Sequence, residues 1–88
     1  MIRATILEEV AGERERQIGK GYRITDDALW TPLDWHEMIA DYNAWARRMM
    51  VMGSPDKARR RYIQIAALAV AAVEALDFEA ALPEEASQ

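Results

Sequence analysis

Apolar residues recur at three- and four-residue steps along most of the chain, which is the spacing of one face of an α-helix. A first helix is predicted from Arg3 to Ile18, with apolar spacing at Ile6, Leu7, Val10, Arg14 and Ile18. A second helix is predicted from Pro32, with Thr31 as its N-cap and Gly53 as its left-handed end residue. Its apolar stripe comprises Trp35, Met38, Ile39, Tyr42, Trp45, Ala46, Met49 and Met52.

The third predicted helix, Ser54 to Phe78, is the segment around which the chain is organised. Ser54 suits the N-cap, and Pro55 suits the first helical position because its φ is already helical. Nine consecutive apolar residues, Ile65 to Val73, leave this helix no clean polar face, so we expect neighbours on more than one side. Because Gly53 alone separates the second helix from Ser54, these two helices are expected to form an antiparallel pair.

No segment shows the strict alternation of a β-strand, so the predicted fold is all-α with three helices. Residues 1–82 are assigned to a single helical domain and residues 83–88 to a frayed C-terminal tail. The segment from Gly19 to Thr31 is predicted to be a loop. A connection this long is either functional or a strap that covers the core.

An 88-residue domain buries only about 60 to 65% of the surface of its unfolded chain, yet 51% of its residues are hydrophobic. We therefore expect part of the apolar surface to meet another copy of the chain. The predicted assembly is a dimer or higher homo-oligomer that forms through the alanine-rich third helix, since alanines let backbones approach closely.

The composition narrows the classes of protein. The chain has no cysteine, which excludes disulfides and thiolate metal sites and fits a reducing compartment. Acidic residues interrupt the N-terminal segment, and the longest apolar run is far shorter than the roughly 20 residues of a membrane span, so a cytoplasmic location in the host cell is expected. A net charge of −4 argues against duplex nucleic acid as a partner.

A cluster of basic residues at the start of the third helix is the main candidate site. Cations oppose the helix dipole there, but the arrangement becomes favourable when an anion such as phosphate occupies the helix start. The predicted ligand-binding cations are Lys57, Arg60, Arg61, Arg47 and Arg48. Arg59 belongs to the same cluster. The alternatives are that these cations pair with carboxylates of the first helix or of a neighbouring subunit, or bind an acidic protein or nucleic acid.

Two aromatic residues of the predicted loop, Tyr22 and Trp30, are candidates to cover a nucleotide base. By contrast, the helical spacing of Trp35, Tyr42 and Trp45 indicates core residues.

Glu74 and Asp77 lie three residues apart on the third helix and are a candidate Mg²⁺ site. Further ligands would come from Glu37, Asp41, Glu9 or Glu13. The alternative is that the two carboxylates are exposed or pair with Arg14 or Arg3. His36 is the sole histidine, so no typical zinc site and no serine–histidine–carboxylate triad is expected.

The text ERERQIGKGYRITDD, followed by the second and third helices, resembles a group of small proteins of bacteriophages and prophages. Thr25 stands where that group has a histidine before Asp26 and Asp27. Glu74 and Asp77 are also similar to the E-x-x-D motif of the MazG-type all-α nucleotide pyrophosphohydrolases, whose E-x-x-E motif this chain lacks.

These resemblances imply a small phage-type protein that binds and sequesters a phosphate-bearing nucleotide, such as a host immune signal, without a cofactor. One alternative is a Mg²⁺-dependent nucleotide pyrophosphohydrolase. Another is an inhibitor that blocks a host protein.

Overall fold

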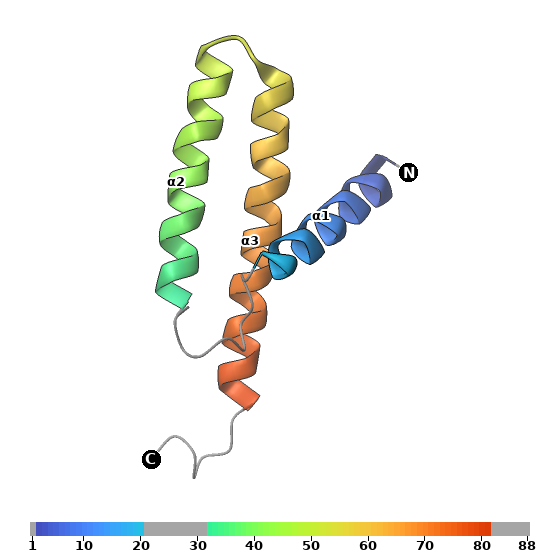
Figure 1. Cartoon of the computed structure of the whole chain (residues 1–88), viewed down its shortest axis with the longest axis vertical. Coiled ribbons are helices and arrows are strands. Elements are labelled where there is room, and N and C mark those ends of the chain that lie inside the picture. Colours follow the sequence, from blue (N-terminus) through green and yellow to red (C-terminus); the bar gives the residue numbers. More distant parts are fainter. Residues whose placement is uncertain (1, 21–31, 82–88) are drawn as a thin grey trace.

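The computed structural model describes residues 2–20 and 32–81, and all of its regular structure there is helical. The elements are α1 (Ile2–Gly19), α2 (Pro32–Val51) and α3 (Pro55–Ala81), as Figure 1 shows. The prediction of an all-α chain with three helices is therefore confirmed, and α3 ends three residues beyond the predicted Phe78. The predicted loop beyond Lys20, the Thr31 cap and the C-terminal tail lie outside the described residues.

A tight turn joins α2 to α3, and in Figure 1 the two helices run side by side as a hairpin. Gly53 has a φ of +77°, the left-handed conformation predicted for it. The Gly53 N–H donates to the Met50 carbonyl at 3.1 Å and the Ser54 N–H to the Met49 carbonyl at 2.8 Å, which is the Schellman pattern of helix ends. The Ser54 carbonyl then accepts the first hydrogen bond of α3, from the Ala58 N–H.

The hydrophobic core lies between α2 and α3. Trp35 and Leu68 are its largest fully buried side chains, and Ala71 and Ala75 complete it on the α3 side. Small residues at the contact let two helix backbones come close, so the alanines of α3 serve the hairpin itself. The alanines of α3 were predicted to lie between copies of the chain. Ala71 and Ala75 instead pack against α2 within one copy.

The α1 helix crosses α3 and then diverges from it toward the N-terminus (Figure 1). It buries only Val10, Arg14 and Gln17, two of which are polar. Ile6 and Leu7, which the apolar spacing places in the same stripe as Val10, are 37% and 60% exposed. Ile6 and Leu7 line grooves between α1 and α3, so the N-terminal part of the predicted stripe lies on the side of α3 without being buried by it.

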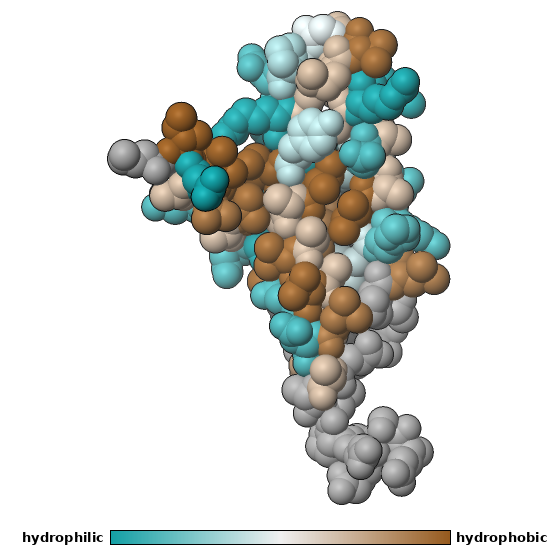
Figure 2. Space-filling model, turned by 180° about the vertical axis from the view of Figure 1, so that it is seen from behind, coloured by the Kyte–Doolittle hydropathy of each residue, from teal (hydrophilic) through white to brown (hydrophobic). Residues whose placement is uncertain are grey.

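The described helices do not form a compact bundle, because α1 points away from the hairpin toward the N-terminus (Figure 1). Apolar residues remain on the surface of α1 and along α3, and Figure 2 shows them on the face opposite to that of Figure 1. No helix among the described residues is long and apolar enough to cross a membrane.

A first prediction tests the close contact at the alanines. Ala71→Leu inserts a larger side chain at a fully buried position and is expected to lower the free energy of unfolding by about 1–3 kcal/mol. The matched control is Ala44→Leu on the exposed face of α2, where little change is expected. Urea unfolding followed by circular dichroism measures both. Equal stabilities of the two variants would contradict the close packing of α2 on α3.

Candidate basic site at the hairpin tip

The end of α2, the turn and the start of α3 form a basic segment, residues 47–61, which we call the hairpin tip. It contains six of the eleven basic residues of the chain and one of its fifteen acidic residues, so it carries +5 while the whole chain carries −4. Concentrated charge of one sign attracts ions of the other sign. The hairpin tip is therefore the part of the chain that is electrostatically suited to an anionic partner.

One cation of the hairpin tip, Arg59, is matched within the chain. Its guanidinium donates two hydrogen bonds to the Glu9 carboxylate of α1, at 2.9 and 2.6 Å. These hydrogen bonds lower the pKa of Glu9 and raise the pKa of Arg59. For this arginine the structure shows the alternative anticipated from the sequence, in which a carboxylate of the first helix takes the charge.

Arg61, a predicted ligand-binding residue, also has contacts inside the chain. Its guanidinium carbon lies 5.6 Å from the ring centre of Tyr42 and 5.1 Å from that of Trp45, both on α2. A terminal nitrogen donates to the Gln64 side-chain oxygen at 3.0 Å. Such cation–π contacts stabilise packing between helices. Arg61 is half-buried and is better explained as part of the α2–α3 contact than as a ligand contact.

The remaining predicted cations, Arg47, Arg48, Lys57 and Arg60, are exposed. None of the four has a hydrogen bond or ion pair from its side chain to any other described residue. The amide N–H groups of Asp56 and Lys57, at the start of α3, likewise have no hydrogen-bond partner in this part of the structure. Free cations and free amide groups thus meet at the same helix end.

A groove of about 440 Å³ lies beside this end of α3. Its lining residues are Glu9, Glu13, Asp56, Arg59, Arg60 and Ile63. With three carboxylates and two guanidinium groups, the lining of the groove has no net positive charge. Glu13 is further engaged by Arg16, which donates to it at 2.9 and 2.5 Å and lowers its pKa, with a smaller contribution from Arg60. An anion therefore has its favourable place on the tip itself rather than in this groove.

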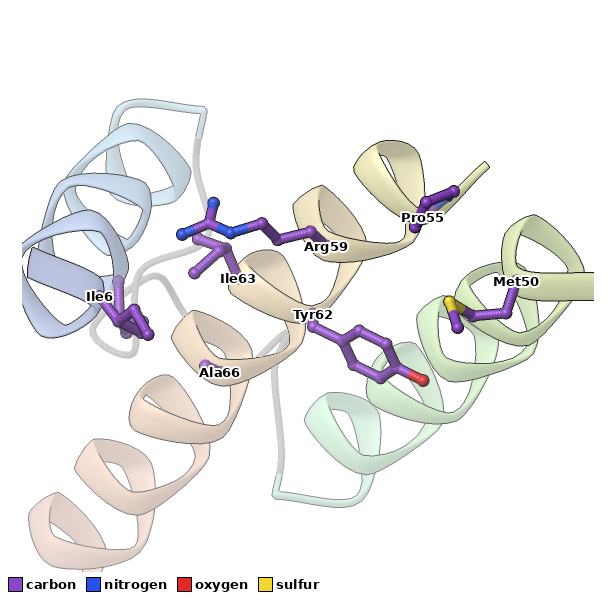
Figure 3. Close-up of a pocket in the computed structure, with 8 residues that line it drawn as sticks. Ile6, Met50, Pro55, Arg59, Tyr62, Ile63 and Ala66 are labelled. Carbon is purple, nitrogen blue, oxygen red and sulfur yellow. The ribbon is translucent and has the colours of Figure 1, made fainter. Parts of the chain in front are cut away.

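A second groove, of about 410 Å³, is almost entirely apolar and lies between α1 and the first half of α3 (Figure 3). Ile6 lines it from α1, Met50 from α2, and Tyr62 and Ala66 from α3. The Arg59 side chain extends over its edge toward α1. The sequence pattern does not predict this groove, because it depends on the angle at which α1 crosses α3.

The candidate metal residues are not assembled into a site. The Arg14 Nε donates to the Glu74 carboxylate at 2.8 Å, which is one of the alternatives anticipated from the sequence. Arg14 is buried and also lies over the ring of Trp35, at 5.7 Å from its centre. Asp77 is exposed, and no three metal-ligating side chains come together within residues 2–20 and 32–81.

The two predicted base-covering residues, Tyr22 and Trp30, lie outside the described residues. The pairing of Arg14 with Glu74 and of Arg59 with Glu9 depends on how α1 packs on α3, so the sequence alone does not determine it. No protein-family model matches the chain, and neither a curated protein nor a solved structure matches it. The resemblances stated from the sequence therefore remain predictions.

A second prediction concerns pH. The lowered pKa values of Glu9 and Glu13 mean that their ion pairs stabilise the fold above the ordinary carboxyl pKa of 4.5, and that this contribution is lost as pH falls through the lowered values. The double variant Glu9→Gln with Glu13→Gln should be less stable at pH 7 and should lose less stability in acid.

The matched control is Glu8→Gln with Glu15→Gln, which removes two carboxylates of α1 that have no ion pair among the described residues. Urea unfolding at a series of pH values from 7 to 3 measures all three proteins. The account is wrong if both double variants lose stability with pH as steeply as the parent protein does.

Proposed function

We propose that the protein is a non-enzymatic binder of a phosphate-bearing nucleotide, which it holds at the hairpin tip. The proposed form is a homo-oligomer of the hairpin, with α2 and α3 antiparallel. The observation that supports binding is the set of four exposed cations, Arg47, Arg48, Lys57 and Arg60, whose side chains have no hydrogen bond or ion pair to another described residue. They lie beside the amide groups of Asp56 and Lys57, which have no hydrogen-bond partner there either.

An anion should bind at the hairpin tip because the cations at the start of α3 repel one another. Cations at a helix N-terminus oppose the dipole, and their mutual repulsion adds to that cost. A phosphate group removes both costs at once, because it accepts hydrogen bonds from amide N–H groups and from lysine and arginine side chains together. A nucleotide carries such phosphates on a ring system that Tyr22 or Trp30 would cover.

The biological role suggested by the resemblance is sequestration of a nucleotide signal of the host cell by a phage-type protein. Sequestration requires tight binding without turnover. The pairing of Glu74 with Arg14 favours this role over hydrolysis, because it removes one carboxylate from the proposed Mg²⁺ set. A Mg²⁺-dependent turnover assay with nucleoside triphosphates separates the alternatives, since stoichiometric uptake without pyrophosphate release supports the binder.

A third prediction tests the tip directly. Lys57→Gln with Arg60→Gln is expected to weaken binding of ATP or of a cyclic dinucleotide on the order of 100-fold, about tenfold for each lost charged contact. Isothermal titration calorimetry measures the affinity. The matched control, Arg3→Gln with Lys20→Gln, removes the same charges from exposed positions at the start of α1 and just beyond its end, and should bind like the parent protein.

Two results would remove the proposal. One is a parent protein that binds neither probe at low salt. The other is an equal loss of affinity in both double variants, which would show a general effect of net charge in place of a site at the tip.

A further inference from the structure

A line of apolar residues runs along the outer side of α3, away from the hairpin core. Its members follow one another at alternating steps of four and three residues: Tyr62, Ala66, Ala69, Val73, Leu76 and Ala80. We call this line the α3 seam. Such spacing is that of the contact line between two helices of a coiled coil. No charged residue interrupts it over roughly 27 Å of helix, taking 1.5 Å per residue.

Apart from the half-buried Ala66, the α3 seam is not covered by the other described helices. Tyr62, Val73 and Leu76 are 48%, 56% and 52% exposed, and Ala69 and Ala80 are exposed as well. The face of α3 toward α2 is a different one, since it buries Leu68, Ala71 and Ala75. Figure 2 shows the apolar surface continuing along α3 toward its C-terminal end.

We propose that the α3 seam pairs with the α3 seam of a second copy of the chain in an antiparallel, two-fold symmetric dimer. This inference names the partner and the surface for the proposed homo-oligomer. It rests on the exposure and spacing of the seam residues, and its test is separate from the calorimetric test of nucleotide binding.

Charge sets the orientation. The first two turns of α3 contain Lys57, Arg59, Arg60 and Arg61, whereas its last two turns contain Glu74, Asp77 and Glu79. An antiparallel pair brings the basic start of each α3 near the acidic end of the other and opposes the two helix dipoles. A parallel pair would place like charges together at both ends, which is unfavourable.

The grooves beside α1 fit the same arrangement. Pairing centred at the level of Ala71 places Ala80, Leu76 and Val73 of the second copy opposite Tyr62, Ala66 and Ala69. Leu76 of the second copy then lies over the apolar groove that Ile6, Tyr62 and Ala66 line. Leu7 and Val70 line a further groove, of about 320 Å³, on the other side of α1. The exposed end of α1 thus flanks the second copy.

A fourth prediction tests the dimer. Light scattering after size-exclusion chromatography should give the parent protein twice the chain mass of 10.0 kDa. Leu76→Glu should shift it to one chain mass with the helical circular dichroism retained. The matched control, Val51→Glu at a 72% exposed position outside the seam, should remain dimeric. A monomeric parent protein, or a Leu76→Glu variant that stays dimeric, overturns the proposal.

A cross-linking experiment tests the orientation and does not depend on a destabilising charge. The chain has no cysteine, so single cysteines are unambiguous. Under oxidation, Ala69→Cys should link to Val73→Cys, and Ala66→Cys should link to Leu76→Cys, when the two variants of each pair are co-expressed, because a disulfide needs Cα atoms within about 7 Å.

Ala69→Cys alone, Leu76→Cys alone and the α2 control Asn43→Cys should not link. Self-linking of both Ala69→Cys and Leu76→Cys would show a parallel pair and overturn the orientation. Failure of every seam cysteine to link would overturn the surface, whereas the calorimetry of the hairpin tip can succeed or fail separately.

Discussion

The Arg14 side chain is the contact by which α1 reaches both helices of the hairpin. It is 6% exposed, donates to Glu74 of α3 at 2.8 Å and lies over the ring of Trp35 of α2. A buried guanidinium is costly unless its hydrogen bonds and charge are matched, so this pair fixes where α1 can cross α3. Because the other buried residues of α1 are only Val10 and Gln17, the crossing is set by polar geometry more than by apolar burial. The position of α1 in turn leaves the α3 seam and the Ile6 end of α1 uncovered.

The molecule therefore has two surfaces that a single chain does not use. The hairpin tip has four exposed cations without a hydrogen bond or ion pair to another described residue, and the α3 seam has apolar side chains that the other described helices do not cover. The seam runs along one side of α3, whereas Lys57, Arg60 and Arg61 occupy other sides of its first turns. A second copy on the seam would leave the tip open to solvent at each end of an antiparallel dimer, so self-association and anion binding are compatible in one assembly.

Local signals predicted the helices well. Gly53 and Pro55 mark the turn because each suits one backbone conformation, and the four-residue spacing around Trp35 and Tyr42 marks the inner face of α2. The pairing of Arg59 with Glu9 and of Arg14 with Glu74 could not be predicted with certainty. These pairs join residues 50 and 60 positions apart, and their contacts depend on the angle between α1 and α3, which no local pattern fixes. The same angle creates the apolar groove at Tyr62.

Native mass spectrometry of the purified, unmodified protein tests the account most directly, because it reports copy number and any retained small molecule in one spectrum. The account predicts a dimer of the 10.0 kDa chain that carries extra mass of nucleotide size, and loss of that extra mass at raised ionic strength. A spectrum of monomer without any retained molecule, taken after gentle purification at low salt, would contradict it.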